Sequence, residues 1–140
     1  MKNHPPQTAF ILAAGFGTRL LPLTLVRPKP LLPLWHRPML EHLIRLLASW
    51  GVTRLIINLH HEAGQIRRFT QHLELPGIDI LFSEERDILG TGGALAHARH
   101  LLDDEPFWLL NADVAASLDP APFLRAFQRQ RPLAALWLNN

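Results

Sequence analysis

The segment "TAFILAAGFGTRLLPLTLVRPKPLLPL", residues 8–34, joins an apolar run to a glycine-rich turn and predicts the fold class. Residues 8–14 are the kind of continuous apolar run that forms a strand buried on both faces of a sheet. The turn that follows, with Gly15 and Gly17, would then lie at the carboxyl end of a parallel strand, where open α/β sheets bind their ligands. We therefore expect a ligand-binding loop directly after the first strand.

Further apolar runs alternate with helical patterns along the rest of the chain. The other expected strands are residues 54–59, 78–83, 106–112 and 133–138, and the expected helices are residues 38–51, 62–73, 91–102 and 121–130. Such alternation is typical of βα units around a mostly parallel sheet with helices on both faces. The fold class expected is α/β, a Rossmann-like three-layer sandwich. With 140 residues, 48% of them hydrophobic, the chain is expected to form one domain, residues 1–140.

Composition argues against several classes of function. No apolar run approaches the roughly 18 residues that span a bilayer, and no signal-peptide pattern is present, so we expect a cytoplasmic protein without a membrane partner. Basic and acidic residues, 14 and 12, are interspersed without a long basic run, which argues against nucleic-acid binding. The absence of cysteine excludes a disulfide scaffold and thiolate sites. His97 and His100 have helical spacing but no third candidate ligand.

The glycine turn suits a phosphate, although its pattern is not a familiar fingerprint. Glycines allow backbone N–H groups to approach a phosphate closely, and Thr18 can cap the turn that follows. The third glycine of the dinucleotide fingerprint would fall where Leu20 stands, and no Walker A lysine follows. Taken alone, Gly15 and Gly17 are explained equally well by a tight βα turn without a ligand.

Two cations in the same segment favour a polyphosphate. The guanidinium of Arg19 can form planar, charge-assisted bonds to phosphate oxygens, and the ammonium of Lys29 is a compact point charge. Pro28 and Pro30 are expected to hold Lys29 in extended geometry. Either cation alone would be read as solvated surface, but the pair is harder to explain in that way. The connection that carries them is too long for an ordinary βα loop, so it should be functional or disordered.

Two later features add candidates. In "SEERDILGTGGALAHA", residues 83–98, Gly92 and Gly93 open a helix; for an isolated instance, helix entry and close packing explain such glycines best. Asp113 follows the apolar run 106–112 at the edge that faces the first loop. A carboxylate in that position is either a turn cap or a metal ligand.

"LAAGFGTRLLPLT" followed by "RPKPLLPL" closely resembles the N-terminal signature of the sugar-1-phosphate nucleotidyltransferases, the nucleoside-diphosphate-sugar pyrophosphorylases. The resemblance implies a fold of the nucleotide-diphospho-sugar transferase type, truncated at the C-terminus and without the sugar-binding half. The implied reaction transfers a nucleoside monophosphate from an NTP to a sugar 1-phosphate and releases pyrophosphate. The partners implied are therefore these two substrates, with Mg²⁺ as cofactor.

The same resemblance implies roles for individual residues. Arg19 would hold the leaving β- and γ-phosphates, Lys29 would neutralise the reacting phosphates, and Asp113 would bind Mg²⁺ with Asn111 beside it. Glu85, with Glu84 as the next candidate, would read the base edge. The residues implied in nucleotide binding are Leu12, Ala13, Ala14, Gly15, Gly17, Thr18, Glu85, Gly92 and Gly93.

The base and the sugar are less sharply indicated. "LGTGGAL" is similar to guanylyltransferases that act on mannose or heptose 1-phosphates, whereas "INLHHEAGQI" is similar to uridylyltransferases that act on N-acetylmuramate 1-phosphate. GTP is expected first and UTP next. The short chain leaves open a non-catalytic nucleotide-binding or regulatory module. It is interpreted as a fragment, a naturally shortened homologue, or a subunit completed by another chain, and self-association into a homo-oligomer is one expectation.

Overall fold

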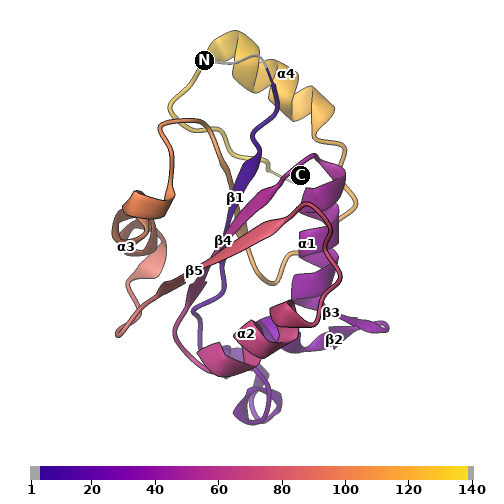
Figure 1. The fold of residues 1–140 in the computed structure, drawn as a ribbon, viewed down its shortest axis with the longest axis vertical. Helices are drawn as coiled ribbons and strands as arrows, with labels where there is room; N and C mark the ends of the chain where they lie inside the picture. The colour runs from indigo at the N-terminus through magenta and orange to yellow at the C-terminus, as the bar shows by residue number, and fades with distance from the viewer. Residues whose placement is uncertain (1–3, 139–140) are drawn as a thin grey trace.

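The computed structural model describes residues 4–138 and is built around a four-stranded sheet (Figure 1). The strand order is β5–β4–β1–β6, and all three ladders are parallel. The strands are β1 (Thr8–Leu12), β4 (Arg54–Leu59), β5 (Asp79–Glu84) and β6 (Trp108–Asn111). The predicted parallel sheet is therefore confirmed.

Helices cover both faces of this sheet. They are α1 (Met39–Ser49), α2 (Ala63–Gln71), α3 (Gly90–His97) and α4 (Ala121–Gln130). Figure 1 shows α1 and α2 on one side of the sheet and α3 on the other. The arrangement is the three-layer α/β architecture that the alternation of strands and helices predicts.

Alternate side chains of the central strands explain why both faces need covering. Ile11 of β1 and Ile57 of β4 lie in a core with α1 and α2, whereas Phe10 and Ile56, their neighbours in sequence, pack with Ala94 of α3. All of these side chains are fully buried. Because successive strand residues point to opposite faces, continuous apolar runs can form only strands that are covered on both sides.

The connection from β1 to α1 is folded rather than extended. It contains three short 3₁₀ turns, η1 (Thr18–Leu20), η2 (Leu23–Leu25) and η3 (Lys29–Leu31), followed by a small hairpin of β2 (Pro33–Leu34) and β3 (Arg37–Pro38). Of the two alternatives for this long segment, a disordered connection is wrong.

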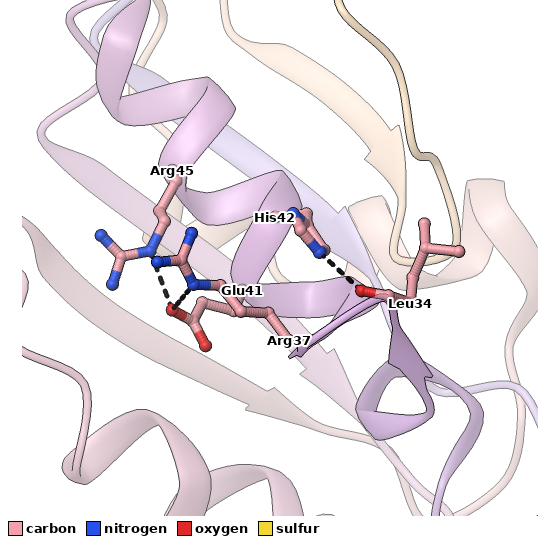
Figure 2. Close-up of polar contacts among 5 residues, drawn as sticks. All are labelled: Leu34, Arg37, Glu41, His42 and Arg45. Carbon is pink, nitrogen blue, oxygen red and sulfur yellow. Dashed lines mark hydrogen bonds and ion pairs between the residues drawn. The ribbon is translucent and has the colours of Figure 1, made fainter.

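Polar contacts fix the hairpin onto α1 (Figure 2). The carboxylate of Glu41, largely buried, accepts from Arg45 Nε at 2.8 Å and lies 3.3 Å from Arg37 Nε on β3. On the other flank His42 Nε2 donates to Leu34 O at 3.0 Å. The end of the β1–α1 connection is thereby attached to a helix that is itself packed in the core.

The bounds of most elements agree with the prediction. Residues 54–59 and 121–130 match β4 and α4, whereas the predicted helix 91–102 divides into α3 and a separate 3₁₀ turn, η4 (Arg99–Leu101). Of the residues described, no helix is long and apolar enough to cross a membrane.

The predicted fifth strand, residues 133–138, is wrong. These residues form no strand, and the side chains of Leu133, Leu136 and Leu138 are exposed. Trp137 stacks on Phe123 of α4, with ring centroids 5.5 Å apart. An apolar run can predict that a segment could join a sheet, but a strand also needs a neighbour to hydrogen-bond with, and β6 and this segment do not pair.

Candidate functional site

A cavity of about 330 Å³ opens at the carboxyl edge of the sheet, between the ends of β1 and β6. The register explains its place, because Leu12 at the end of β1 is paired with Asn111 at the end of β6. The cavity is lined by Leu12, Ala13, Gly15, Gly17, Thr18, Arg19, Leu20, Lys29, Pro30, Asn111, Ala112 and Asp113. Eight of the predicted site residues, all but Ala14, Glu85, Gly92 and Gly93, are in this lining.

The glycine turn is shaped by two different requirements. Gly17 has φ +64°, and a Cβ there would lie 2.9 Å from Thr24 Cγ2 and 3.0 Å from Lys29 Cβ. Thr24 is buried, and its hydroxyl donates to Gly17 O at 3.1 Å. Gly15 is different, since a Cβ there would meet no atom within 4 Å. Gly17 therefore serves the packing of the turn, and Gly15 leaves bare backbone beside the cavity.

Thr18 does not cap the turn that follows. It is the first residue of η1, the N-cap position belongs to Gly17, and no side-chain capping bond is formed. Thr18 is exposed and lines the cavity instead. The capping expectation was wrong because it placed the turn one residue too late.

Lys29 is held on a turn rather than on an extended strut. Pro28 is extended, with ψ 144°, but Lys29 begins η3, where Leu32 N donates to Lys29 O at 3.0 Å. Extended geometry at Lys29 was therefore a wrong prediction, because the fixed φ of Pro30 fits a helical first turn equally well. From this turn the Lys29 ammonium forms an ion pair with Asp113 Oδ2 across the cavity.

Arg19 is exposed and has no ion pair or hydrogen bond within residues 4–138. With Lys29 it brings two cations to a cavity that has one carboxylate, Asp113. Side-chain cations beside bare backbone form an arrangement that can bind an anion with several oxygens.

Asp113 is suited to a hard divalent cation that is shared with a ligand. Its side chain is 38% exposed, and its other carboxylate oxygen is not engaged by Lys29. In the described part of the chain no three His, Asp or Glu side chains gather as a metal site. This donor set fits Mg²⁺, which commonly takes one or two carboxylates and completes its shell with phosphate oxygens and water.

The second glycine segment lies outside the cavity. Gly92 and Gly93 fall in the first turn of α3, and a Cβ on Gly93 would lie 2.8 Å from Leu89 Cβ. For Gly93 close packing is thus a sufficient explanation, while Gly92 faces open space. Contact of either glycine with a base stays a prediction.

Glu85 is buried beneath this segment rather than exposed at a pocket. One carboxylate oxygen accepts from Asn58 Nδ2 at 2.7 Å and the other from Leu89 N at 3.0 Å. Its role in reading a base edge stays a prediction. Asn58 was not predicted at all, although an amide in an otherwise apolar strand is a signal that could have identified it.

Three lining residues were also missed: Leu20, Pro30 and Ala112. They flank predicted residues, so their positions follow from the geometry of η1, η3 and the end of β6 rather than from a separate motif.

Comparison with known proteins gives a consistent family. A family model described as nucleotidyl transferase matches residues 8–137. Mannose-1-phosphate guanyltransferase of Candida albicans is 43% identical over 107 residues, covering 74% of this chain and 30% of that protein. The corresponding protein of Schizosaccharomyces pombe is 40% identical over 124 residues, covering 86% and 34%. This chain therefore spans about a third of the length of these curated relatives.

Solved structures support the same grouping. HddC from Yersinia pseudotuberculosis, complexed with GMP-PN, matches with a TM-score of 0.75 and 30% identity, over 86% of this chain and 54% of that one. A putative glucose-1-phosphate thymidylyltransferase from Bacillus anthracis matches with a TM-score of 0.79 and 26% identity, over 89% and 51%. With the sheet, the loop and the family model in agreement, the chain belongs to the nucleotidyl transferase family.

Proposed function

We propose that this chain binds an NTP and takes part in transferring its nucleoside monophosphate to a sugar 1-phosphate, with release of pyrophosphate. The single observation that carries the proposal is the cavity at the end of β1, where bare backbone, two cations and one carboxylate converge. The family and the guanylyltransferase relatives support the same reaction.

The reaction needs positioning and charge neutralisation rather than a protein nucleophile. An oxygen of the sugar 1-phosphate attacks the α-phosphorus, the bond between that phosphorus and the bridging oxygen to the β-phosphate breaks, and pyrophosphate carries away the electron pair. Both reactants are anions, so the catalyst must hold them in line and stabilise the charge that moves to the leaving group.

The lining residues can divide that task among them. Backbone around Gly15 approaches the phosphates, Arg19 binds the leaving β- and γ-phosphates, and Lys29 neutralises the reacting centre. Asp113 is the residue that would hold Mg²⁺, which when bound supplies Lewis-acid neutralisation of phosphate oxygens. The Lys29–Asp113 ion pair keeps both side chains directed into the cavity in the free protein.

GTP is the proposed nucleotide, with UTP second. The first relatives are named as mannose-1-phosphate guanyltransferases, which supports guanine and a mannose 1-phosphate acceptor. HddC was solved with GMP-PN, which also supports guanine. The alternative is a non-catalytic nucleotide-binding or regulatory module, which would hold an NTP in the same cavity without transferring its nucleoside monophosphate.

Calorimetric titration with GTP, UTP, ATP and dTTP in the presence of Mg²⁺ tests the proposal. Saturable binding of GTP, weakened in Arg19→Ala, is the expected result. A folded protein that binds none of the four nucleotides would refute it. Release of pyrophosphate from GTP and mannose 1-phosphate then separates the enzyme from the non-catalytic module.

A further inference from the structure

Asn58 and Glu85 are two buried polar side chains that the proposed phosphate chemistry does not use. Their residues are 3% and 5% exposed, and neither lines the cavity. Asn58 lies on the central strand β4, paired with Leu12 of β1 on one side and with Ser83 of β5 on the other. Burial of an amide and a carboxylate is unfavourable unless hydrogen bonds satisfy them, so their partners are informative.

The partners connect the two glycine-rich loops. Ala13 N donates to Asn58 Oδ1 at 2.6 Å, just after the end of β1. Asn58 Nδ2 donates to Glu85 Oε1 at 2.7 Å, and Leu89 N donates to Glu85 Oε2 at 3.0 Å, just before α3. A continuous series of hydrogen bonds therefore joins Ala13 in the first glycine loop to Leu89 at the start of the second glycine-rich segment.

The segment that carries Glu85 is fixed at its backbone as well. Glu85 N donates to Leu59 O at 2.8 Å, and His60 Nδ1 donates to Glu85 O at 3.0 Å. The Glu85 carboxylate therefore has a defined position, and the amides of Ala13 and Leu89 are held relative to it.

We propose that Asn58 and Glu85 are positioning residues that hold the first glycine loop and the entry to α3 in one fixed arrangement for nucleotide binding. The proposal rests on the proposed function, since it assumes that both loops contact the same nucleotide. Loops that are ordered before the ligand arrives lose less entropy on binding, so the pair would raise affinity without touching the ligand.

In the wild type, each hydrogen bond of the series can have only one direction from donor to acceptor. The N–H groups of Ala13 and Leu89 can only donate, so the side chains between them must accept at both ends. Asn58 accepts from one amide and donates to Glu85, and the carboxylate accepts at both of its oxygens. In Glu85→Gln one side-chain N–H₂, either that of the new glutamine or that of Asn58, must face another donor, whichever way the two side chains are turned. In Asn58→Asp two carboxylates face each other.

The double variant Asn58→Asp/Glu85→Gln restores every bond with the polarity of the middle bond reversed. Aspartate at position 58 accepts from the Ala13 amide and from the new glutamine, whose carbonyl oxygen accepts from the Leu89 amide. Side-chain volume and total charge are nearly unchanged. Each single variant should therefore bind GTP more weakly, and the double variant should regain GTP affinity.

The first measurement is GTP affinity by calorimetry, with Mg²⁺, for the wild type, both single variants and the double variant, at a temperature where urea titrations show each to be folded. We expect each single variant to bind about tenfold more weakly, the size that loss of one charge-assisted buried bond implies. The double variant should return to within about threefold of the wild type.

Leu43→Ala is the control for stability alone. Leu43 is a buried core residue of α1 that neither lines the cavity nor takes part in this series of hydrogen bonds, so the variant should lower the free energy of unfolding while GTP affinity stays at the wild-type value. Single variants with wild-type affinity, or a double variant as weak as the two losses combined, overturn the proposal.

Amide hydrogen exchange, followed by NMR in the nucleotide-free protein, separates this proposal from the proposed function. We expect faster exchange at Ala13 and Leu89 in both single variants and restored protection in the double variant. If the wild type binds no nucleotide, the proposed function fails while this exchange pattern still tests the connection between the loops. Unchanged exchange at both amides in both single variants overturns the connection itself.

Discussion

At the scale of single residues, Gly15 and Gly17 lie in the same turn, but a side chain would fit only at Gly15. Gly17 has positive φ and no room for a Cβ, because Thr24 and Lys29 approach it closely. Gly17→Ala should therefore destabilise the fold by about 1–3 kcal/mol, through backbone strain and displacement of these side chains. Urea denaturation measures the effect.

Gly15→Ala is the matched control for that variant. Its Cβ would meet no protein atom, so the free energy of unfolding should stay within about 0.5 kcal/mol of the wild type. NTP affinity should fall nonetheless, because the methyl group would occupy space beside the cavity. Equal destabilisation by the two substitutions would contradict this assignment of roles.

Arg19 should strengthen the binding of nucleoside triphosphates but not of nucleoside monophosphates. Because it is unpaired among residues 4–138 and lines the cavity, Arg19→Ala should weaken NTP binding about tenfold to a hundredfold, the range for a hydrogen bond to a charged group. Affinity for the matching NMP should change little, since that ligand lacks the β- and γ-phosphates. Calorimetry with both ligands makes the comparison.

Arg125→Ala provides the control for net charge. Arg125 is exposed on α4 and does not line the cavity. If this substitution weakened NTP binding as much as Arg19→Ala does, the effect would come from the overall field of the protein rather than from a contact at Arg19.

At the scale of elements, the buried carboxylate of Glu41 attaches the β2–β3 hairpin to α1. This carboxylate joins Arg37 of β3 to Arg45 of α1, as Figure 2 shows. Both arginines are about half exposed, so solvent screens the pair and Glu41→Gln should lower the free energy of unfolding by only about 0.5–1 kcal/mol. Urea denaturation at low and high salt should show the difference shrinking as salt rises.

Glu74→Gln is the matched control for Glu41→Gln. Glu74 is exposed and has no ion pair within the described residues, so its substitution should leave stability unchanged at either salt concentration. A loss for Glu41→Gln that does not depend on salt would mean that packing, rather than charge, fixes the hairpin.

The elements also mark how far the sequence could predict the structure. Four of the residues 54–59 are apolar, and two of these, Ile56 and Ile57, are β-branched, so β4 could be predicted to the residue. The lining of the cavity was predictable where a motif is continuous in sequence, from Leu12 to Lys29. The bonds of Asn58 to Ala13 and Glu85 could not be predicted, because they join residues 45 and 27 positions apart whose proximity only the sheet register determines. Residues 133–138 were mispredicted because apolarity does not reveal whether a strand has a neighbour.

At the scale of the whole molecule, two surfaces make self-association the expected behaviour. β6 is an edge strand of the described sheet, and the segment after α4 exposes Leu133, Leu136 and Leu138, each more than three-quarters accessible to solvent. A free strand edge and clustered apolar side chains both favour contact with another chain. We therefore expect the apparent mass of the 140-residue chain to rise with protein concentration in sedimentation or light-scattering measurements.

The source of that association can be located by substitution. In Leu133→Ser/Leu136→Ser/Leu138→Ser the apolar segment is removed while the core is untouched, so the mass should stay near that of a monomer, 15.9 kDa, over the same range. The control is Leu25→Ser/Val26→Ser, which removes two equally exposed apolar side chains from the loop after β1.

If the control reduced association as strongly, general surface apolarity would be responsible. If the triple variant still associated like the wild type, the contact would lie elsewhere, and the β6 edge would be the next surface to test. A wild-type chain that stayed monomeric at every concentration would show that neither surface recruits a second copy.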